Sequence, residues 1–151
     1  MTPKLPVSVL VVVHTPQLDV LLIERAQRPG FWQSVTGSLD RLDEPPAEAA
    51  LREVREETGI AGDRAALSDW RIANVFEIYP QWRHRFAPGT THNTEHVFGL
   101  VVRERVPVTL APDEHVAYEW LPWREAEARC FSWTNRDAIR RLRQLSAKAG
   151  G

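Results

Sequence analysis

The sequence has almost no cysteine and no long apolar run. Its 151 residues include a single cysteine, Cys130, so an internal disulfide framework is excluded. We expect Cys130 to be a small packing residue in a reducing cytoplasm. The longest apolar run, Val7–Val13, is interrupted by Ser8 and is too short to span a membrane. No small-residue cleavage site follows it, so it does not have the pattern of a signal peptide. These features predict a cytoplasmic protein.

The sequence also lacks an excess of charge of either sign. Its 19 Lys and Arg residues nearly balance its 20 Asp and Glu residues, which gives a formal net charge of −1 at pH 7. This balance provides no electrostatic basis for general binding to nucleic acid or to a membrane. Hydrophobic residues at 43% and charged residues at 26% are ordinary for a globular protein. A chain of this length is expected to form one domain, residues 1–151, around one core.

The order of the expected strands and helices indicates an α/β (α+β) fold with a mixed or largely antiparallel sheet. Valine-rich Val7–His14 and the following Val20–Arg25 are expected strands that could pair as a hairpin. Further extended segments are expected at Phe31–Gly37, Asp69–Tyr79, Thr94–Arg103 and Val116–Leu121. Helices are expected at Pro45–Thr58, Pro122–Ala128 and Asn135–Ala147, the last with Ser132 or Thr134 as its N-cap. Pro80–Asn93 is expected to be a polar loop.

The densest chemical pattern is Gly37–Ile60, GSLDRLDEPPAEAALREVREETGI. It predicts a glycine turn, an acidic loop, a helix opened by prolines and a stop at Gly59. Glu53, Glu56 and Glu57 are spaced i, i+3 and i+4, so their carboxylates share one side of that helix. Helical geometry places them beside an apolar stripe of Ala47, Ala50, Leu51, Val54 and Thr58, with Glu48, Arg52 and Arg55 on the far side. The clustered carboxylates repel one another unless a cation is bound between them.

Taken alone, a Glu-x-x-Glu-Glu pattern is common on solvated helices. Arg52 could simply form i,i+4 ion pairs with Glu48 and Glu56. The longer pattern is more specific, because REVREETGI resembles the second half of the Nudix box. Gly37 and Glu44 resemble its first half. On these residues the chain is identified as a member of the Nudix family.

The chain departs from the Nudix pattern in one loop. Six residues separate Gly37 from Glu44, where the family pattern has five. We assign the extra residue to the loop Ser38–Asp43, because the spacing from Glu44 to the helix is otherwise in register. Leu42 also stands where the family often has glycine. The departure bears on the loop conformation and on any metal contact from the Gly37 carbonyl.

The resemblance implies a Nudix fold, a mixed β-sheet sandwiched between helices, and metal-dependent hydrolysis of a diphosphate linkage. Glu53, Glu56 and Glu57 would hold metal, and Glu53 or Glu56 would act on the attacking water, with the identity of the general base left open. Arg52 would orient these carboxylates, and Glu44 would support the start of the helix. Ligands that are all oxygen favour Mg²⁺, with Mn²⁺ as a substitute. A further metal ligand is expected from outside the box, with Glu114 preferred over its neighbour Asp113.

Other strings extend the resemblance along nearly the whole chain. They are LPVSVLVVV, RPGFWQSVTGS, FEIYPQWRHRFAPGTTHNTEH, DEHVAYEWL and FSWTNRDAI. In this order they resemble the dihydroneopterin triphosphate pyrophosphatase branch of the Nudix family, which acts in bacterial folate synthesis. The implied partner is a small-molecule triphosphate, without nucleic acid, membrane or an obligate protein partner. The alternatives are a pyrophosphatase for dATP or an oxidised purine nucleotide, and a catalytically silent binding domain, against which the intact glutamates argue.

The same resemblance implies particular substrate contacts. Lys4 and Arg25 would meet phosphates, and Thr36 would offer a hydroxyl or backbone group. The pterin side would be lined by Phe76, Glu77, Ile78, Tyr79, Ser132 and Trp133, and Glu114 is also counted among the substrate contacts. A flat heterocycle needs an apolar wall and a few hydrogen-bond partners, and Glu77 could accept from an N–H pair. Strand alternation alone would instead give Phe76 and Ile78 a packing role.

Overall fold

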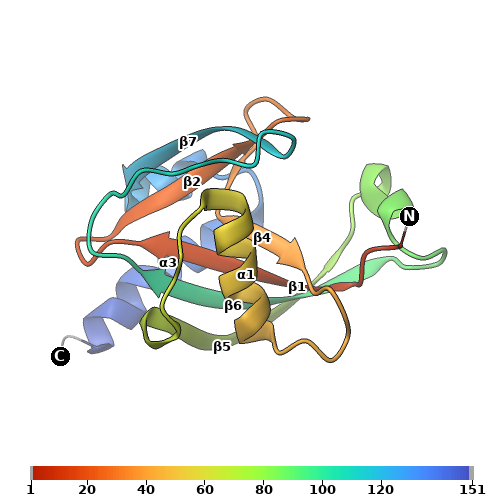
Figure 1. Ribbon diagram of the computed structural model, residues 1–151, viewed down its shortest axis with the longest axis horizontal. Coiled ribbons are helices and arrows are strands. Elements are labelled where there is room, and N and C mark those ends of the chain that lie inside the picture. The colour runs from red at the N-terminus through yellow and green to blue at the C-terminus, as the bar shows by residue number, and fades with distance from the viewer. Residues whose placement is uncertain (1, 150–151) are drawn as a thin grey trace.

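The computed structural model describes residues 2–149; Met1, Gly150 and Gly151, at the ends of the expected domain, lie outside the described residues. The described chain forms a seven-stranded mixed sheet with helices on both faces (Figure 1), which confirms the expected fold class. The strands are β1 (Val7–His14), β2 (Asp19–Arg25), β3 (Trp32–Gln33), β4 (Val35–Ser38), β5 (Leu67–Glu77), β6 (His92–Val101) and β7 (His115–Pro122). The helices are α1 (Pro46–Thr58), α2 (Trp123–Arg129) and α3 (Trp133–Ala149), with short 3₁₀ helices η1 (Arg64–Ala66) and η2 (Pro80–Arg85).

Strand β1 is the centre of the sheet. It runs parallel to β6 along its whole length, and β6 in turn pairs antiparallel with β5. On its other side β1 changes partner: β4 pairs with Ser8–Val11, whereas β2 pairs at His14. The expected β1–β2 hairpin therefore forms, but β2 diverges and pairs instead with β3 and β7. The divergence separates the β2–β7 part of the sheet from β4 (Figure 1).

Two apolar clusters pack on opposite faces of the sheet, because successive residues of β1 alternate between them. Val9 and Val11 join the cluster under α1, whereas Leu10 and Val12 join the cluster under α2 and α3. Cys130 belongs to the second cluster, and burial raises the pKa of its thiol to about 12, as suits a packing residue. Among the described residues, no helix has the length and apolar character needed to cross a membrane.

Helix α1 begins and ends as the sequence predicts, but the side chains of Glu56 and Arg52 do not lie as expected. Pro46 occupies its first turn, and Gly59 ends it at φ 74°, where its N–H donates to the Arg55 carbonyl at 2.9 Å. Glu53 and Glu57 are buried, whereas Glu56 is exposed. Arg52 was expected on the far side of the helix; that expectation is wrong. Its long, flexible side chain reaches the acidic loop, and only 16% of it is exposed.

Elsewhere the structure shifts several expected boundaries. The loop expected at Pro80–Asn93 contains the 3₁₀ helix η2, and β6 starts at His92, two residues before the expected Thr94. Ser132 is the N-cap of α3, because its hydroxyl accepts from the Asn135 N–H at 3.2 Å.

Replacing Gly59 with Ala is expected to lower the free energy of unfolding by about 1–2 kcal/mol, because a side chain strains the left-handed conformation. Gly59→Asn is the matched control, since asparagine tolerates this conformation better. Urea denaturation followed by circular dichroism at constant pH measures both losses. We expect the asparagine variant to lose less; equal losses would mean that contact with Thr109, and not backbone conformation, explains the glycine.

Candidate active site

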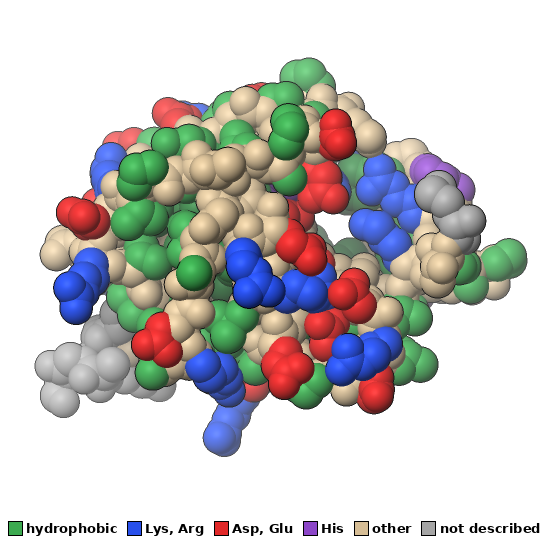
Figure 2. Space-filling view, in the orientation of Figure 1, with side chains coloured by type: hydrophobic (Ala, Val, Ile, Leu, Met, Phe, Trp, Pro, Cys, Tyr) green, Lys and Arg blue, Asp and Glu red, His purple; other side chains and the backbone are tan. Residues whose placement is uncertain are grey.

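One end of the sheet opens into a cavity of about 1180 Å³. Figure 2 shows the hollow with acidic side chains on one side and basic side chains on the other. The metal ligands and substrate contacts predicted from the sequence all line it: Lys4, Arg25, Thr36, Glu53, Glu56, Glu57, Phe76, Glu77, Ile78, Tyr79, Glu114, Ser132 and Trp133. Arg52 is the predicted catalytic residue that is not part of this lining. Residues far apart in the sequence therefore meet in one cavity.

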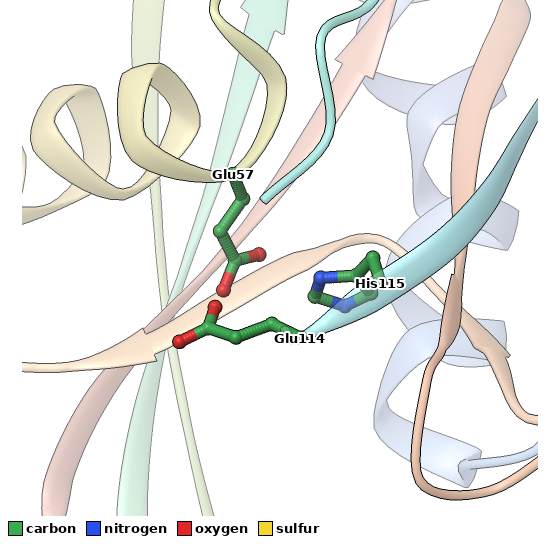
Figure 3. Close-up of side chains that lie close together, drawn as sticks. All are labelled: Glu57, Glu114 and His115. Atoms are coloured by element: carbon green, nitrogen blue, oxygen red, sulfur yellow. The ribbon is translucent and has the colours of Figure 1, made fainter. Parts of the chain in front are cut away.

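Three side chains on the acidic wall converge closely enough to hold a metal ion. Glu57, Glu114 and His115 each offer a ligand atom, and these atoms lie within 4.8 Å of one another (Figure 3). Backbone hydrogen bonds fix the segment before β7: the Glu114 N–H donates to Ala111, and its carbonyl accepts from Ala26 at 2.9 Å. The structure thus places Glu114, not the neighbouring Asp113, beside Glu57.

The carboxylates of the acidic wall are crowded, and among the described residues Arg52 pairs with Glu53 and Glu56 but not with Glu57. Burial, and then the charges of Glu53 and Glu114, raise the pKa of Glu57 to about 9. Its Oε2 atom is buried with no hydrogen-bond partner among the described residues. Burial also raises the pKa of Glu53 to about 7, although a hydrogen bond from Arg52 opposes this. A divalent cation fits this group, because it would offset the repulsion and satisfy the unpaired oxygen.

Gly37 leaves the space in which the Glu53 carboxylate lies. The sequence predicts a turn at Gly37, but this is wrong, because Gly37 belongs to β4 and pairs with Val9 of β1. A Cβ atom at Gly37 would clash with the carboxyl group of Glu53. The glycine is therefore required by close approach of the helix side chain to the strand.

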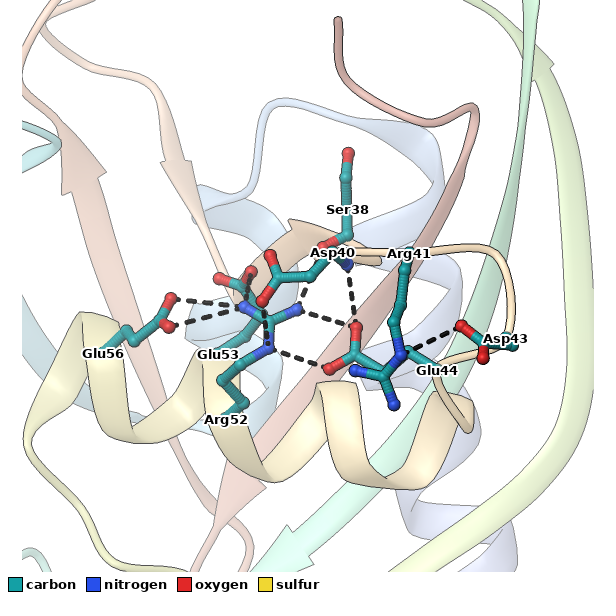
Figure 4. Close-up of polar contacts among 8 residues, drawn as sticks. All are labelled: Ser38, Asp40, Arg41, Asp43, Glu44, Arg52, Glu53 and Glu56. Carbon is teal, nitrogen blue, oxygen red and sulfur yellow. Dashed lines mark hydrogen bonds and ion pairs between the residues drawn. The ribbon is translucent and has the colours of Figure 1, made fainter. Parts of the chain in front are cut away.

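Arg52 joins the acidic loop to the helix (Figure 4). It donates to Glu44 through Nε at 2.9 Å, to Glu53 through Nη1 at 2.9 Å and to the Ser38 carbonyl at 3.2 Å. It also pairs with the exposed Glu56 at 3.3 Å. The hydrogen bond from Arg52 lowers the pKa of Glu44, and the same contact raises the pKa of Arg52. Arg52 therefore does much more than form a simple surface ion pair.

The opposite wall carries crowded cations. Lys4, Arg25, Arg28 and Arg85 all line the cavity. Partial burial, followed by the nearby charges of Arg85 and Arg25, lowers the pKa of Lys4; burial and Arg85 likewise lower the pKa of Arg25. The Arg25 guanidinium also lies 4.8 Å from the ring centre of Trp82. A multiply charged anion would relieve this repulsion.

The third part of the lining is apolar and aromatic. Phe76 on β5 is half-buried, Ile78 is buried, and both face the cavity despite the packing role that alternation alone favours. Tyr79 is 38% exposed and forms an edge contact with Trp82 at 5.3 Å between ring centres. Glu77 is exposed and forms an ion pair with Arg83. The structure thus provides a wall for a flat ring, but its Glu77 carboxylate is already paired.

Sequence reasoning missed several polar residues of the cavity. Burial, and then Arg25, lower the pKa of His115 to about 4, so its imidazole is neutral at pH 7. The Gln33 amide is hydrogen-bonded to His115 Nε2 at 3.3 Å, and the Nδ1 atom has no hydrogen-bond partner among the described residues. Asn93 and Glu95 are also buried in the lining. Their signal in the sequence was polarity at positions that alternate in phase with the buried Val97.

The sequence matches a known domain family and two relatives of known name. The sequence profile of the NUDIX domain matches residues 4–142. The chain is 42% identical to dihydroneopterin triphosphate diphosphatase of Escherichia coli K12 over 90% of this chain and 91% of the relative. It is 38% identical to the Haemophilus influenzae protein of the same name, over 89% of this chain and 85% of the relative.

A solved structure has the same fold. The fold matches the structure of the E. coli dihydroneopterin triphosphate pyrophosphohydrolase with a TM-score of 0.82 at 42% identity, over 92% of this chain and 95% of that chain. The residues matched by the domain profile include the box residues on β4 and α1. The chain belongs to the Nudix family of hydrolases.

Proposed function

We propose that this chain is a Mg²⁺-dependent enzyme that hydrolyses dihydroneopterin triphosphate to dihydroneopterin monophosphate and pyrophosphate, a step of folate synthesis. The observation that carries the proposal is a single cavity with an acidic wall, a cationic wall and an apolar wall. A metal ion, a triphosphate and a flat ring match these three walls in turn. The names of the E. coli and H. influenzae relatives support the choice of substrate.

The acidic wall would hold the divalent ion. Glu57 and Glu114 converge directly, and Glu53 and Glu56 line the same part of the cavity, so these four carboxylates are the proposed ligands. Carboxylate oxygens favour Mg²⁺, for which Mn²⁺ can substitute. When bound, the ion would offset the negative charge of the phosphates during hydrolysis.

The protein's own groups would orient the attacking water. Arg52 holds both proposed catalytic carboxylates, Glu53 and Glu56, so either is positioned to accept a proton from the water. The pKa of Glu53, about 7 in the absence of a ligand, lies near the pH at which such a base is effective. Glu44 would act through Arg52 by fixing the direction of its guanidinium.

The other two walls would bind the substrate. Lys4 and Arg25 would pair with phosphate oxygens, and Thr36 lies on β4 where its hydroxyl accepts a hydrogen bond from Gln33 at 3.4 Å. Phe76, Ile78, Tyr79, Ser132 and Trp133 would surround the ring. Arg25 and Tyr79 both contact Trp82, so the phosphate and ring sites would adjoin one another, and the triphosphate would extend from the ring between the cationic and acidic walls.

A substrate panel tests the choice of ring. With Mg²⁺ present, we expect dihydroneopterin triphosphate to release pyrophosphate, and not single phosphate, with a higher kcat/KM than dATP, dGTP or an oxidised purine nucleotide. Product identification by phosphorus NMR, with a metal-free control, distinguishes the two products. A much higher kcat/KM for dATP or another nucleotide would overturn the pterin assignment while leaving the hydrolase intact.

The Glu57→Gln variant tests the metal site. We expect kcat to fall by at least about a hundredfold, because a charged group that stabilises the transition state is lost. The fold should be preserved, because the metal-free Glu57 carboxyl, with a pKa of about 9, is already neutral at pH 7 and glutamine has nearly the same shape. The matched control is Glu48→Gln, an exposed carboxylate on the same helix. Near-normal turnover of Glu57→Gln, measured under saturating Mg²⁺, would place the metal site elsewhere.

A further inference from the structure

A third buried carboxyl group of the cavity lining belongs to β6, and not to α1 as Glu53 and Glu57 do. Glu95 is only 5% exposed, and the described residues offer it no ion pair. Its Oε1 atom is buried without a hydrogen-bond partner. Burial raises the pKa of this carboxyl to about 7, although a hydrogen bond from Thr134 opposes the shift. A buried acceptor that is left unpaired is costly, so its retention in a cavity wall points to a ligand.

The neighbours of Glu95 supply a second acceptor and an aromatic surface. Asn93 is two residues earlier on β6 and therefore shares its face of the sheet. The Asn93 amide donates to Ser8 Oγ at 2.7 Å, which leaves its Oδ1 buried and unpartnered among the described residues. Phe76 lies opposite Asn93 on β5 and lines the same cavity. Two acceptors thus lie beside a ring-sized apolar wall.

Local partners do not account for these acceptors. Asn74 is the cross-strand neighbour of Glu95 on β5, but its Nδ2 is itself buried and without a hydrogen-bond partner, so it does not bond to the carboxyl. Asn135, at the N-terminus of α3, is engaged with the Ser34 N–H at 2.8 Å. The cavity lining includes Glu95 and Asn93 but not Asn74. Glu95 and Asn93 therefore belong to the wall of the space that a ligand would fill.

We propose that Glu95, assisted by Asn93, selects the substrate ring by accepting hydrogen bonds from two adjacent donors, the amide N–H and the 2-amino group of a 2-amino-4-oxo ring. Pterins and guanine carry this donor pair, whereas adenine presents an acceptor beside its amino group. This inference rests on the proposed function and assigns recognition of the substrate's ring to Glu95. Glu77, expected from the sequence to do this, is exposed and paired with Arg83, which makes it the poorer acceptor.

The chemistry predicts strong discrimination between rings that differ only at position 2. A 2-amino group donates to the Glu95 carboxylate, whereas a carbonyl oxygen at the same position faces it with lone pairs. Sites built to hydrogen-bond a buried ligand group reject analogues that lack the group. Pterin and lumazine differ in this substituent, because lumazine carries a 2-carbonyl group where pterin carries a 2-amino group. Both lack phosphate, so they report on ring binding alone.

Fluorescence titration with pterin and with lumazine tests the proposal on the wild-type protein and on Glu95→Gln. We expect the wild-type protein to bind pterin at least about tenfold more tightly, the worth of a hydrogen bond to a charged group. In Glu95→Gln the preference should disappear or invert, because the amide N–H₂ can donate to the lumazine carbonyl. Affinity for inorganic pyrophosphate should not change. The control Glu119→Gln, on β7 outside the cavity lining, should retain the wild-type preference.

Equal affinity of the wild-type protein for pterin and lumazine, or no binding of either, would overturn the proposal. So would an unchanged preference in a folded Glu95→Gln variant. If that variant does not fold, competition by dGTP and dITP on the wild-type protein decides, because dITP lacks the 2-amino group. We expect dITP to bind at least about tenfold more weakly, and equal binding would refute the role of Glu95. These outcomes concern ring binding, so they are separate from any failure to hydrolyse dihydroneopterin triphosphate.

Discussion

Repulsion among buried carboxylates is the constraint on which the site depends. Glu53 and Glu57 are held on α1 against the sheet, and Glu114 is brought to them by the turn before β7. Arg52 fixes the loop and the helix relative to one another, and Gly37 leaves room for the Glu53 carboxyl group. The fold thus maintains a group of carboxyl groups whose charge the chain itself neutralises only in part, through Arg52. Burial first, and then the neighbouring carboxylates, raise the pKa values of Glu53 and Glu57. A bound divalent cation would favour the ionised form of both groups.

The cationic wall likewise brings like charges together, in this case positive ones. Lys4, Arg25 and Arg85 come from three separate segments, and their mutual repulsion lowers the pKa values of Lys4 and Arg25 further than burial alone. A substrate that carries several negative charges would bind to both the cations of this wall and the metal of the other. Polar recognition of a neutral ring needs different groups, and the buried acceptors of β6 belong to the lining of the same cavity. Charge would hold the phosphates, whereas hydrogen bonds would choose the ring.

The parts of the fold and the site that depend on local sequence were predictable. The α1 limits follow from Pro46 and Gly59, and the spacing of Glu53 and Glu57 places both on one side of the helix. The predictions that were wrong or missing depend on how far a long side chain extends, or on the pairing of strands that are distant in the sequence. Arg52 left its expected side because a long side chain bends toward acceptors that a helical projection does not include. His115 and Glu95 became visible only through the pairing of β2 with β7 and of β1 with β6, which sequence alone does not specify.

The most direct test of the account is the pH dependence of stability with and without Mg²⁺. The folded-state pKa of Glu57, about 9, lies above the ordinary value of 4.5, so the metal-free protein should lose stability as pH rises from 7 to 9. Glu57→Gln should not show this loss, so the comparison isolates Glu57 from other titrating groups. Saturating Mg²⁺ should stabilise the wild-type protein more at pH 9 than at pH 7, because the carboxyl is then already ionised. Parallel pH profiles of the wild-type protein and Glu57→Gln in EDTA, measured by urea denaturation, would contradict the account.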